Sequence, residues 1–268
     1  MTDAERARPV VLTIAGSDSG GGAGIQADLK AISAMGGWGA SAITCLTSQN
    51  LTGVRSVQPT EPRILADQID AVCEGFEVRA VKTGMLYSSD LIQVVIERLR
   101  VHHTGPVVVD PVMVATSGAK LLQDSAIEIL RDSLLPMASL VTPNLHEAEI
   151  LAGFPVPAIS TMQAAAETIF QLGAANVLVK GGHLEDEAVD VLFDGTETHE
   201  FRAPRIAATT ATHGTGCTLA SAIAAGLALG RSMPDAVADA KRLITDALER
   251  RCLLSPGVQA LDVFFAWR

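Results

Sequence analysis

Short, almost continuously apolar runs alternate along this chain with longer stretches in which apolar residues recur every three or four positions. The apolar runs are rich in β-branched residues and end in Gly, Pro or Asp, as is typical of parallel strands buried on both faces. They lie at 9–16, 80–85, 106–113, 139–144 and 176–183. The stretches between them predict helices at 24–35, 62–76, 88–100, 123–134, 145–152, 161–173, 215–230 and 234–250. This alternation predicts an α/β fold in which helices cover both faces of a mostly parallel sheet, giving three αβα layers.

Two segments depart from the alternation and predict an antiparallel edge. In 189–204 an Asp-Gly pair separates two extended runs, which is a hairpin pattern. Residues 41–59 likewise predict a strand, a loop and a second strand. The 268 residues contain no long linker, repeat or low-complexity segment, so we expect a single domain over 1–268.

The charge balance narrows the choice of partners. The 20 Lys and Arg residues stand against 30 Asp and Glu residues, for a net charge of −10, and no long basic block occurs. Nucleic-acid binding by charge alone is therefore not expected, whereas a local phosphate site is compatible with this composition.

The chain has the features of a cytoplasmic protein with no membrane partner. Its first ten residues mix acids and bases and resemble no signal peptide. Its apolar stretches are shorter than the ~20 residues of a membrane span. The cysteines are far apart and show no C-x-x-C spacing, which indicates reduced thiols; they are Cys45, Cys73, Cys217 and Cys252.

Polar and glycine-rich residues follow the predicted strands. In open α/β sheets ligands bind at the carboxyl ends of the parallel strands. The segments at those ends are Gly16–Gly24, Thr83–Met85, Asp110–Met113, Thr142–Glu147 and Lys180–His183. We therefore expect one shared site at this edge of the sheet.

The first of these segments, AGSDSGGGAGIQADLK, is a glycine-rich loop that leads into a helix. Glycines allow close approach of the backbone to a ligand, and a helix start offers unpaired N–H groups. The segment is neither a Walker A loop nor a G-x-G-x-x-G fingerprint. A plain tight turn is the alternative, with Asp28 a first-turn charge favoured by the helix dipole.

The segment TPNLHEAEIL places Asn144 and Glu147 three residues apart at a helix start. By spacing alone this pattern favours a capping box. The alternative is a pair of oxygen donors for a hydrated Mg²⁺ ion. Asp110 and Lys180 end buried strands, where the two could pair with each other or the lysine could contact a phosphate.

The segment HGTGCTLASAIAAG has the pattern of an anion cradle, which we define as Gly214–Cys217. Its glycines lead into a helix whose first N–H groups have no partner within the helix. In that first turn Cys217 is expected to have a lowered thiol pKa. The alternative for Cys217 is a buried structural cysteine.

Together these segments resemble the hydroxymethylpyrimidine/phosphomethylpyrimidine kinases of thiamine biosynthesis, within the ribokinase-like superfamily. The matching segments, in chain order, are LTIAGSDSGGGAGIQADLK, SAITCLTSQN, AVKTGML, VVVDPVM, TPNLHEAEIL, VKGGHL and THGTGCTLASAIAA. The likeness runs from residue 10 to about 250. It does not extend to LLSPGVQALDVFFAWR, where the family commonly has G-x-G-x-G-P followed by His.

The resemblance implies a ribokinase-like fold, ATP and Mg²⁺ as cofactors, a pyrimidine substrate and a homodimer. It implies that the catalytic residues are Cys217, Lys180, Gly214, Thr215 and Gly216. It implies that the pyrimidine pocket is lined by Asp28, Gln49, Met85 and Val112, with Gln49 hydrogen-bonded to the ring. It implies that the nucleotide phosphates are contacted by Asp110, Lys180, Asn144 and Thr215, and that Mg²⁺ is served by Glu147 and Asn144.

In most of the wider superfamily an aspartate at the Cys217 position acts as the catalytic base. The resemblance implies that the Cys217 thiolate replaces it and accepts, or hydrogen-bonds, the proton of the substrate hydroxyl group. The expected reaction is phosphorylation of 4-amino-5-hydroxymethyl-2-methylpyrimidine and then of its monophosphate. Two alternatives stay open: a pyridoxal kinase of the same fold and a non-catalytic pyrimidine sensor. A dinucleotide-dependent oxidoreductase is disfavoured, because no G-x-G-x-x-G follows the first strand.

Overall fold

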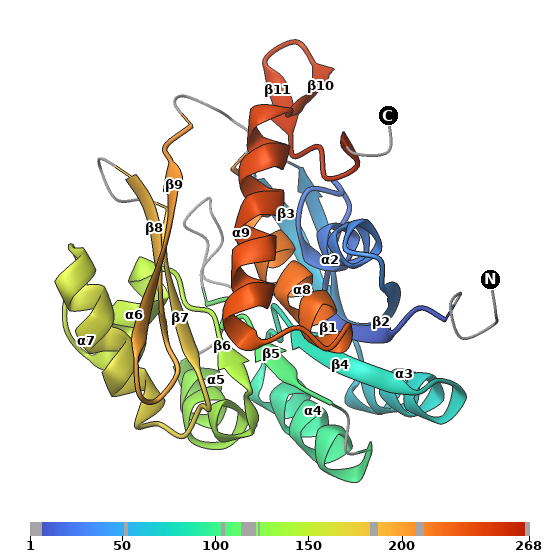
Figure 1. Cartoon of the computed structure of the whole chain (residues 1–268). Helices are drawn as coiled ribbons and strands as arrows, with labels where there is room; N and C mark the ends of the chain where they lie inside the picture. The colour runs from blue at the N-terminus through green and yellow to red at the C-terminus, as the bar shows by residue number, and fades with distance from the viewer. Residues whose placement is uncertain are drawn as a thin grey trace.

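The computed structural model of the chain describes residues 7–50, 53–102, 105–113, 122, 124–182, 187–206 and 212–265. Within these ranges, nine strands form one mixed sheet in the order β3-β2-β1-β4-β5-β6-β7-β8-β9 (Figure 1). They are β1 (Val10–Asp18), β2 (Trp38–Asn50), β3 (Gly53–Pro59), β4 (Val78–Thr83), β5 (Val107–Val109), β6 (Leu140–Val141), β7 (Val177–Gly181), β8 (Glu187–Phe193) and β9 (Thr198–Pro204).

The central strands are parallel and both edges are antiparallel. Strands β2, β1, β4, β5, β6 and β7 pair in parallel with their neighbours. The β2–β3 pair and the β7–β8–β9 ribbon are antiparallel. The predicted mostly parallel sheet is confirmed, and so are the hairpin predicted for 189–204 and the second strand predicted within 41–59.

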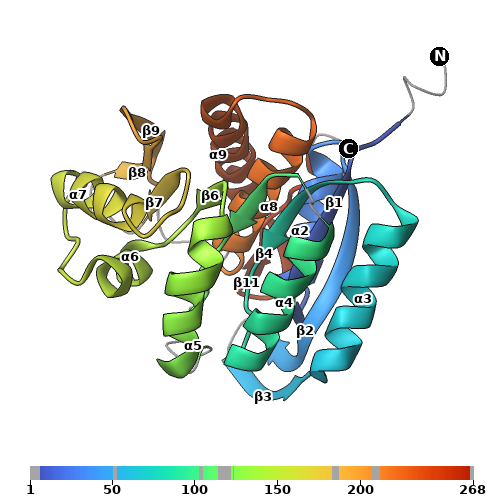
Figure 2. The ribbon, with the colours of Figure 1, turned by 90° about the horizontal axis from the view of Figure 1, so that it is seen from below.

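Helices cover both faces of the sheet. They are α2 (Gly24–Ala34), α3 (Pro62–Gly75), α4 (Ser89–His102), α5 (Asp124–Ile129), α6 (Leu145–Ala152), α7 (Ile159–Phe170), α8 (Thr215–Ala228) and α9 (Met233–Glu249). In the view from below, α3, α4 and α5 lie along one face and α8 and α9 along the other (Figure 2).

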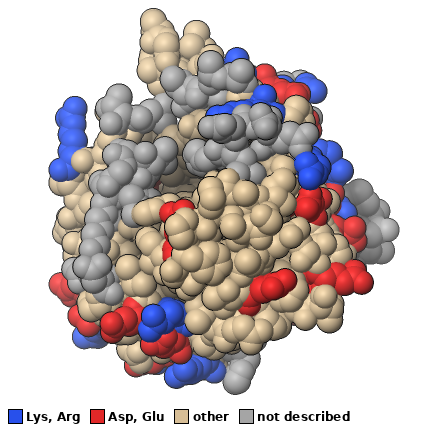
Figure 3. Space-filling model, turned by 90° about the vertical axis from the view of Figure 1, so that its left-hand side faces the viewer, with Lys and Arg blue, Asp and Glu red and all other residues tan. Residues whose placement is uncertain are grey.

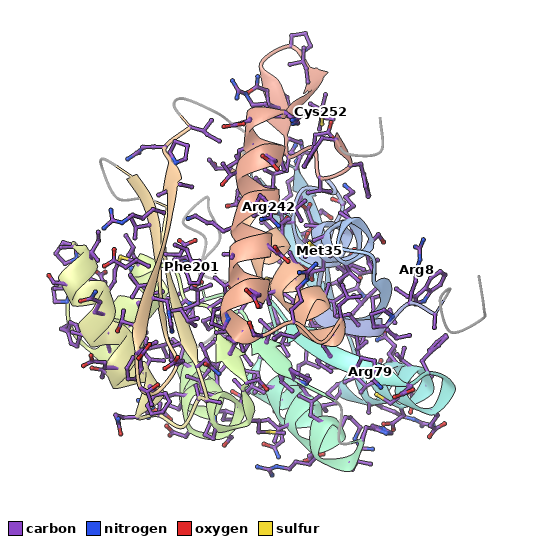
Figure 4. The ribbon with its side chains drawn as sticks, viewed as in Figure 1. Arg8, Met35, Arg79, Phe201, Arg242 and Cys252 are labelled. Carbon is purple, nitrogen blue, oxygen red and sulfur yellow. The ribbon has the colours of Figure 1, made fainter. Side chains whose placement is uncertain are left out.

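Alternation along the central strands produces this layering. Successive side chains of a strand point to opposite faces. In β4, Ala80 packs with the α2, α8 and α9 layer, whereas its neighbour Val81 packs with the layer of α3 to α7. Phe201 of β9 packs toward α9 and extends the first of these two cores to the edge of the sheet (Figure 4). The three-layer fold predicted from the sequence is confirmed.

The structure differs locally from the predicted elements. The strand predicted for 106–113 ends at Val109, because Pro111 has no N–H to continue the ladder. The helix predicted for 123–134 is α5 followed by a π-helical turn, Leu130–Leu134, and a 3₁₀ turn, Leu135–Met137. A small hairpin, β10 (Cys252–Ser255) with β11 (Val258–Ala260), was not predicted.

The strand order places a crevice beside β1. The chain moves outward from β1 to β2 on one side and to β4 on the other, so loops leaving β1 and β4 diverge at their carboxyl ends. Of the helices described here, none has the length and apolar character to cross a bilayer. On the face nearest α7, Lys and Arg side chains are scattered and do not form one basic patch (Figure 3).

Candidate active site

A cavity of about 530 Å³ lies at the carboxyl ends of the parallel strands. The glycine-rich loop, the ends of β2 and β7 and the start of α8 all contribute to its wall. The segments expected to share a site at this edge therefore do line one cavity. With the exception of Asp28, every site residue predicted from the sequence lines the cavity: Gln49, Met85, Asp110, Val112, Asn144, Glu147, Lys180, Gly214, Thr215, Gly216 and Cys217.

Asp18 organises the glycine-rich loop around its own carboxylate. Its oxygens accept hydrogen bonds from the backbone N–H groups of Gly20 at 2.8 Å, Gly22 at 3.1 Å and Ala23 at 2.8 Å. Burial raises the pKa of Asp18, but the imidazole of His213 and the N–H groups of Ala23 and Gly20 outweigh it and hold the pKa below its usual range. Asp18 is not among the site residues predicted from the sequence, although an Asp before a run of glycines is a known loop-forming signal.

The anion cradle (Gly214–Cys217) touches the glycine-rich loop directly. Gly214 is the N-cap residue of α8 and has a φ of 81°, in the left-handed region. A Cβ at Gly214 would lie 1.8 Å from the carbonyl oxygen of Gly22, so this position requires glycine. The first N–H groups of α8 belong to the cradle, and N–H groups at this position have no acceptor within their own helix. This geometry suits an anion between the two loops.

Lys180 and Asp110 form a buried ion pair beside the cradle. Lys180 Nζ donates to Asp110 Oδ1 at 2.7 Å, and Thr142 Oγ1 donates to the same oxygen at 3.2 Å. Burial lowers the pKa of Lys180, but the carboxylates of Asp110 and Glu147 outweigh it and raise the pKa above its ordinary value. A Cβ on Gly216 would lie 3.2 Å from Lys180 Nζ, so the ammonium group is in contact with the cradle.

A second Lys–Asp pair lies below the cavity and corrects the prediction for Asp28. Lys82 Nζ donates to both Asp28 oxygens, at 2.9 and 3.0 Å, and both side chains are 0% exposed. Thr13 Oγ1 and Ser221 Oγ also donate to Asp28, at 2.6 and 2.7 Å. Asp28 is thus neither a first-turn surface charge nor part of the cavity wall, because four hydrogen bonds from three donor groups hold it beneath the floor.

Lys82, in contrast to Asp28, does line the cavity, although it is not among the site residues predicted from the sequence. A lysine inside an otherwise apolar strand, as in AVKTGM, is the signal that could have found it. Burial disfavours its charge, yet Asp28 raises the pKa of Lys82 well above its ordinary value. The ammonium group therefore stays charged at the floor of the site.

The lowered pKa expected for Cys217 is wrong. Burial raises the pKa of the Cys217 thiol to about 11, and the carboxylates of Asp28 and Asp110 add to this shift. Lys82 and the backbone N–H of Gly24 favour the thiolate, but they do not overcome desolvation. Position at a helix start is thus not sufficient for a low thiol pKa where partial burial and two nearby carboxylates disfavour the thiolate.

Asn144 and Glu147 form the capping box that their spacing predicted. Asn144 Oδ1 accepts from Glu147 N at 2.9 Å, and Glu147 Oε2 accepts from Asn144 N at 2.8 Å. Both residues also line the cavity, so the cap does not exclude a second role. Burial raises the pKa of Glu147 to about 7, a shift that Lys180 opposes and Asp110 increases.

The donors at this end of the cavity suit a hydrated Mg²⁺ ion better than a closed metal cage. In the part of the chain that the structure describes, no group of three or more His, Cys, Asp or Glu side chains could hold a metal. Mg²⁺ typically keeps several waters and uses one or two carboxylates together with substrate phosphates. Glu147 and Asp110 lie at the same end of the cavity and have the chemistry that such an ion requires.

The other end of the cavity was not predicted from the sequence. It is lined by residues of β8, β9 and α9, among them Asp190 and Lys241. Lys241 Nζ donates to Asp190 Oδ2 at 2.7 Å, and Asp190 Oδ1 accepts from Gly181 N at 2.9 Å. The pair joins the hairpin to α9. These residues lie in ordinary amphipathic elements, so no local pattern marked them.

Comparison with known proteins gives consistent matches over nearly the whole chain. The model of the family described as phosphomethylpyrimidine kinase matches residues 18–262. The hydroxymethylpyrimidine/phosphomethylpyrimidine kinase of Streptomyces coelicolor is 47% identical over 254 residues, covering 95% of this chain and 94% of that protein. The chloroplastic thiamine biosynthetic bifunctional enzyme of Arabidopsis thaliana is 48% identical over 270 residues, covering 98% of this chain. The chain spans only 52% of that bifunctional relative.

Solved structures show the same architecture. An ADP complex of Bacillus subtilis pyridoxal kinase has a TM-score of 0.90 at 36% identity and covers 97% of this chain and 99% of its own. Phosphomethylpyrimidine kinase from Clostridium difficile has a TM-score of 0.80 at 44% identity and covers 90% of this chain and 100% of its own. The pyridoxal kinase has the higher TM-score, whereas the phosphomethylpyrimidine kinase has the higher sequence identity.

Proposed function

Because this chain belongs to the phosphomethylpyrimidine kinase family, we propose that it transfers the γ-phosphoryl group of ATP to 4-amino-5-hydroxymethyl-2-methylpyrimidine and then phosphorylates the product to the diphosphate. One observation supports this most: a single cavity holds an amide that can bind a ring, Gln49, and an anion cradle that begins α8. Phosphoryl transfer requires little more than such positioning and charge stabilisation.

The cradle and two lysines supply the charge stabilisation in this proposal. The N–H groups of Gly214, Gly216 and Cys217 bind the transferring phosphoryl group, and Thr215 joins them by exchanging its bonds to the carbonyl oxygen of Thr212 for bonds to the phosphoryl oxygens. Lys180, in contact with the cradle, neutralises charge on the phosphate oxygens, and Asp110 keeps that ammonium group in place. Lys82 contributes a second positive charge from the floor of the cavity.

The pyrimidine end of the site holds the acceptor. Gln49 hydrogen-bonds the ring, and Met85 and Val112 pack against it. The hydroxymethyl oxygen then points toward the cradle, where Cys217 receives its proton as a thiolate. Because the pKa of Cys217 is about 11, the thiolate is a minor form at pH 7 and turnover should rise with pH.

Asn144, Glu147 and Asp110 are the residues that would hold a hydrated Mg²⁺ ion, together with the nucleotide phosphates. When bound there, the ion would offset negative charge on the β- and γ-phosphates. The end of the cavity beside Lys241 receives the rest of the nucleotide.

We further propose that the chain is a single kinase domain that acts in the cytoplasm as a homodimer. Sedimentation of the purified chain tests the homodimer, and fractionation of the source cells tests the location.

The decisive experiment measures ATP turnover with the aminopyrimidine, its monophosphate and pyridoxal side by side. Pyridoxal is included because a pyridoxal kinase is among the similar solved structures. We expect both pyrimidines to be phosphorylated with higher kcat/KM than pyridoxal, with products identified by mass. Phosphorylation of pyridoxal but of neither pyrimidine would identify the protein as a pyridoxal kinase. Binding of the pyrimidine without any ATP turnover would identify it as a sensor.

A further inference from the structure

The side-chain amide of Gln49 has a fixed position but two possible orientations. Ser19 Oγ donates to the carbonyl oxygen of Gln49 at 2.7 Å and accepts from its N–H at 2.8 Å, which fixes the backbone. As drawn, the amide oxygen is the atom 3.2 Å from Thr47 Oγ1 and the amide nitrogen is the atom 3.2 Å from His213 Nε2. A half-turn of the amide exchanges its oxygen and nitrogen without changing its shape, so its neighbours decide which atom faces which side.

His213 accepts only one of these orientations. Its Nε2 lies 3.0 Å from Oδ2 of Asp18, a buried carboxylate that already accepts backbone N–H groups. An ionised carboxylate offers acceptors alone, so His213 Nε2 must carry a hydrogen and donate it. This holds for the neutral and for the charged ring. A nitrogen that carries a hydrogen cannot accept one from an amide NH₂ group, whereas its N–H can be shared between Asp18 Oδ2 and an amide oxygen. The amide oxygen therefore belongs on this side, which is the half-turned orientation of the amide as drawn.

Thr47 leads independently to the same orientation. Its Oγ1 donates to the carbonyl oxygen of Ser17 at 2.9 Å. A hydroxyl group has one hydrogen, so toward Gln49 this oxygen acts only as an acceptor. The amide nitrogen therefore belongs on the Thr47 side. Thr47 of β2 and His213, in the segment before α8, therefore both require the same orientation of the Gln49 amide.

We infer that His213 and Thr47 hold the Gln49 amide with its oxygen toward His213 and its nitrogen toward Thr47, and that this orientation sets the direction in which the pyrimidine binds. The inference rests on the proposed function. The substrate edge presents a 4-amino donor next to the ring-N3 acceptor, and the hydroxymethyl group is on C5, beside the amino group. With the amino group on the amide oxygen, the hydroxymethyl group lies on the His213 side.

That side leads to the cradle, because Gly214–Cys217 follows His213 directly in the chain. The opposite amide orientation would pair with a ring turned over, whose hydroxymethyl group points away from Cys217. His213 and Thr47 are thus positioning residues that act through Gln49. Their role is to make one direction of ring binding productive and to select a 4-amino over a 4-oxo ring.

The test uses the 4-oxo analogue, 5-hydroxymethyl-2-methylpyrimidin-4(3H)-one, whose N3–H donor and C4=O acceptor reverse the polarity of the edge. A fixed amide should reject it, and we expect the wild-type protein to prefer the 4-amino compound by at least about tenfold in kcat/KM. In the double variant Thr47→Val/His213→Phe the amide can turn, so the preference should fall to about twofold or less. His213→Phe and Thr47→Val alone should give intermediate values.

A control variant and a double-mutant cycle distinguish an effect on the orientation of the Gln49 amide from a general effect on the protein's structure. His199→Phe removes an imidazole that pairs with Asp194 at 3.0 Å outside the cavity, and it should leave the preference unchanged. In a Gln49→Ala background, His213→Phe should no longer alter the preference. Equal losses with both substrates, or an effect that persists without Gln49, would overturn the inference. No turnover of the 4-amino compound by the wild-type protein would overturn the proposed function and this inference with it.

Discussion

Lys82 and Asp28 form an ion pair in which neither side chain is exposed to solvent, with Lys82 Nζ 2.9 and 3.0 Å from the two carboxylate oxygens. The pair joins β4 to α2 at the floor of the cavity. It lies where the strand order reverses direction, beside β1. The pair therefore supports both the sheet and the site.

Replacing one member of this pair should destabilise the protein strongly. Lys82→Met leaves a buried carboxylate without its cation and should cost about 3–5 kcal/mol of unfolding free energy. The double variant Asp28→Asn/Lys82→Met should recover much of that loss, because no unpaired charge remains. Denaturant unfolding measures both. Arg63→Met, at a surface pair with Asp67, is the control and should cost less than about 1 kcal/mol. Additive losses in the double variant would mean that the two charges do not stabilise each other.

Glu147 should make Mg²⁺ binding depend on pH. Its pKa of about 7 means that the protonated, neutral form prevails below pH 7 and the ionised form above it. Apparent Mg²⁺ affinity should therefore rise about tenfold from pH 6 to pH 8, as the ionised fraction does. Stability changes in the opposite sense: the raised pKa favours folding at low pH, and this contribution is lost as the pH rises from 4.5 to about 7.

Glu147→Gln keeps the geometry of a capping residue at N3 but removes the titration. It should flatten this pH dependence and lower Mg²⁺-dependent turnover at pH 8 by at least about tenfold, or 1.4 kcal/mol. Glu149→Gln, on the same helix and outside the cavity, is the matched control. A flat Mg²⁺ profile in the wild-type protein, with loss of stability only in Glu147→Gln, would leave this residue as a helix cap.

Cys217 should act in turnover rather than in packing alone. Cys217→Ala should lower kcat by roughly 10²–10⁴, the usual range for general acid–base catalysis, with little change in KM for ATP. Cys217→Asp should retain more activity, because a carboxylate restores a proton acceptor that is ionised at neutral pH. It should also abolish the rise of kcat with pH that a thiol of pKa about 11 predicts. Cys252→Ala, in the β10 hairpin beyond α9, should be neutral (Figure 4). Full activity of Cys217→Ala would contradict the assigned role.

The raised thiol pKa makes a separate prediction for alkylation. The rate of modification of Cys217 by iodoacetamide should rise about tenfold per pH unit from pH 7 to pH 9, because only the thiolate reacts. Bound pyrimidine should protect the residue. Peptide mapping by mass spectrometry gives the rate at each pH. A rate independent of pH above 7 would show that the helix start stabilises the thiolate after all.

Gly214 should not tolerate a side chain, because a Cβ there would clash with the glycine-rich loop. Gly230, which has the same φ but no such neighbour, is the control. Gly214→Ala puts a Cβ 1.8 Å from Gly22 O and must separate the cradle from the glycine-rich loop, so kcat/KM should fall at least about tenfold. Gly230, just beyond the other end of α8, has the same φ of 81°, but a Cβ there would have nothing within 4 Å. Gly230→Ala should therefore cost about 1 kcal/mol of stability and leave kcat unchanged. Equal kinetic effects of the two substitutions would point to backbone strain rather than to the contact.

Local sequence patterns were sufficient to predict most of the elements, the layers and the edge of the sheet at which the cavity lies. Each depends on a short-range pattern: continuous apolar runs for buried strands, a 3.6-residue period for helices, and the Asp-Gly pair for the hairpin. The capping box of Asn144 and Glu147 is local in the same sense, because its two bonds join residues three apart. The carboxyl ends of parallel strands then bring the polar segments together without further information.

The electrostatics and the partners of individual side chains depend on long-range packing and became visible only in the folded structure. Asp28 and Lys82 are 54 residues apart and Gln49 and His213 are 164 apart, so no local pattern predicts that they meet. The same packing reversed the expected pKa shift of Cys217, since desolvation depends on every atom that surrounds the sulfur and not on its place in the helix. Local periodicity fixes where backbone hydrogen bonds form, whereas burial and long-range contacts fix which charges and protons the site can hold.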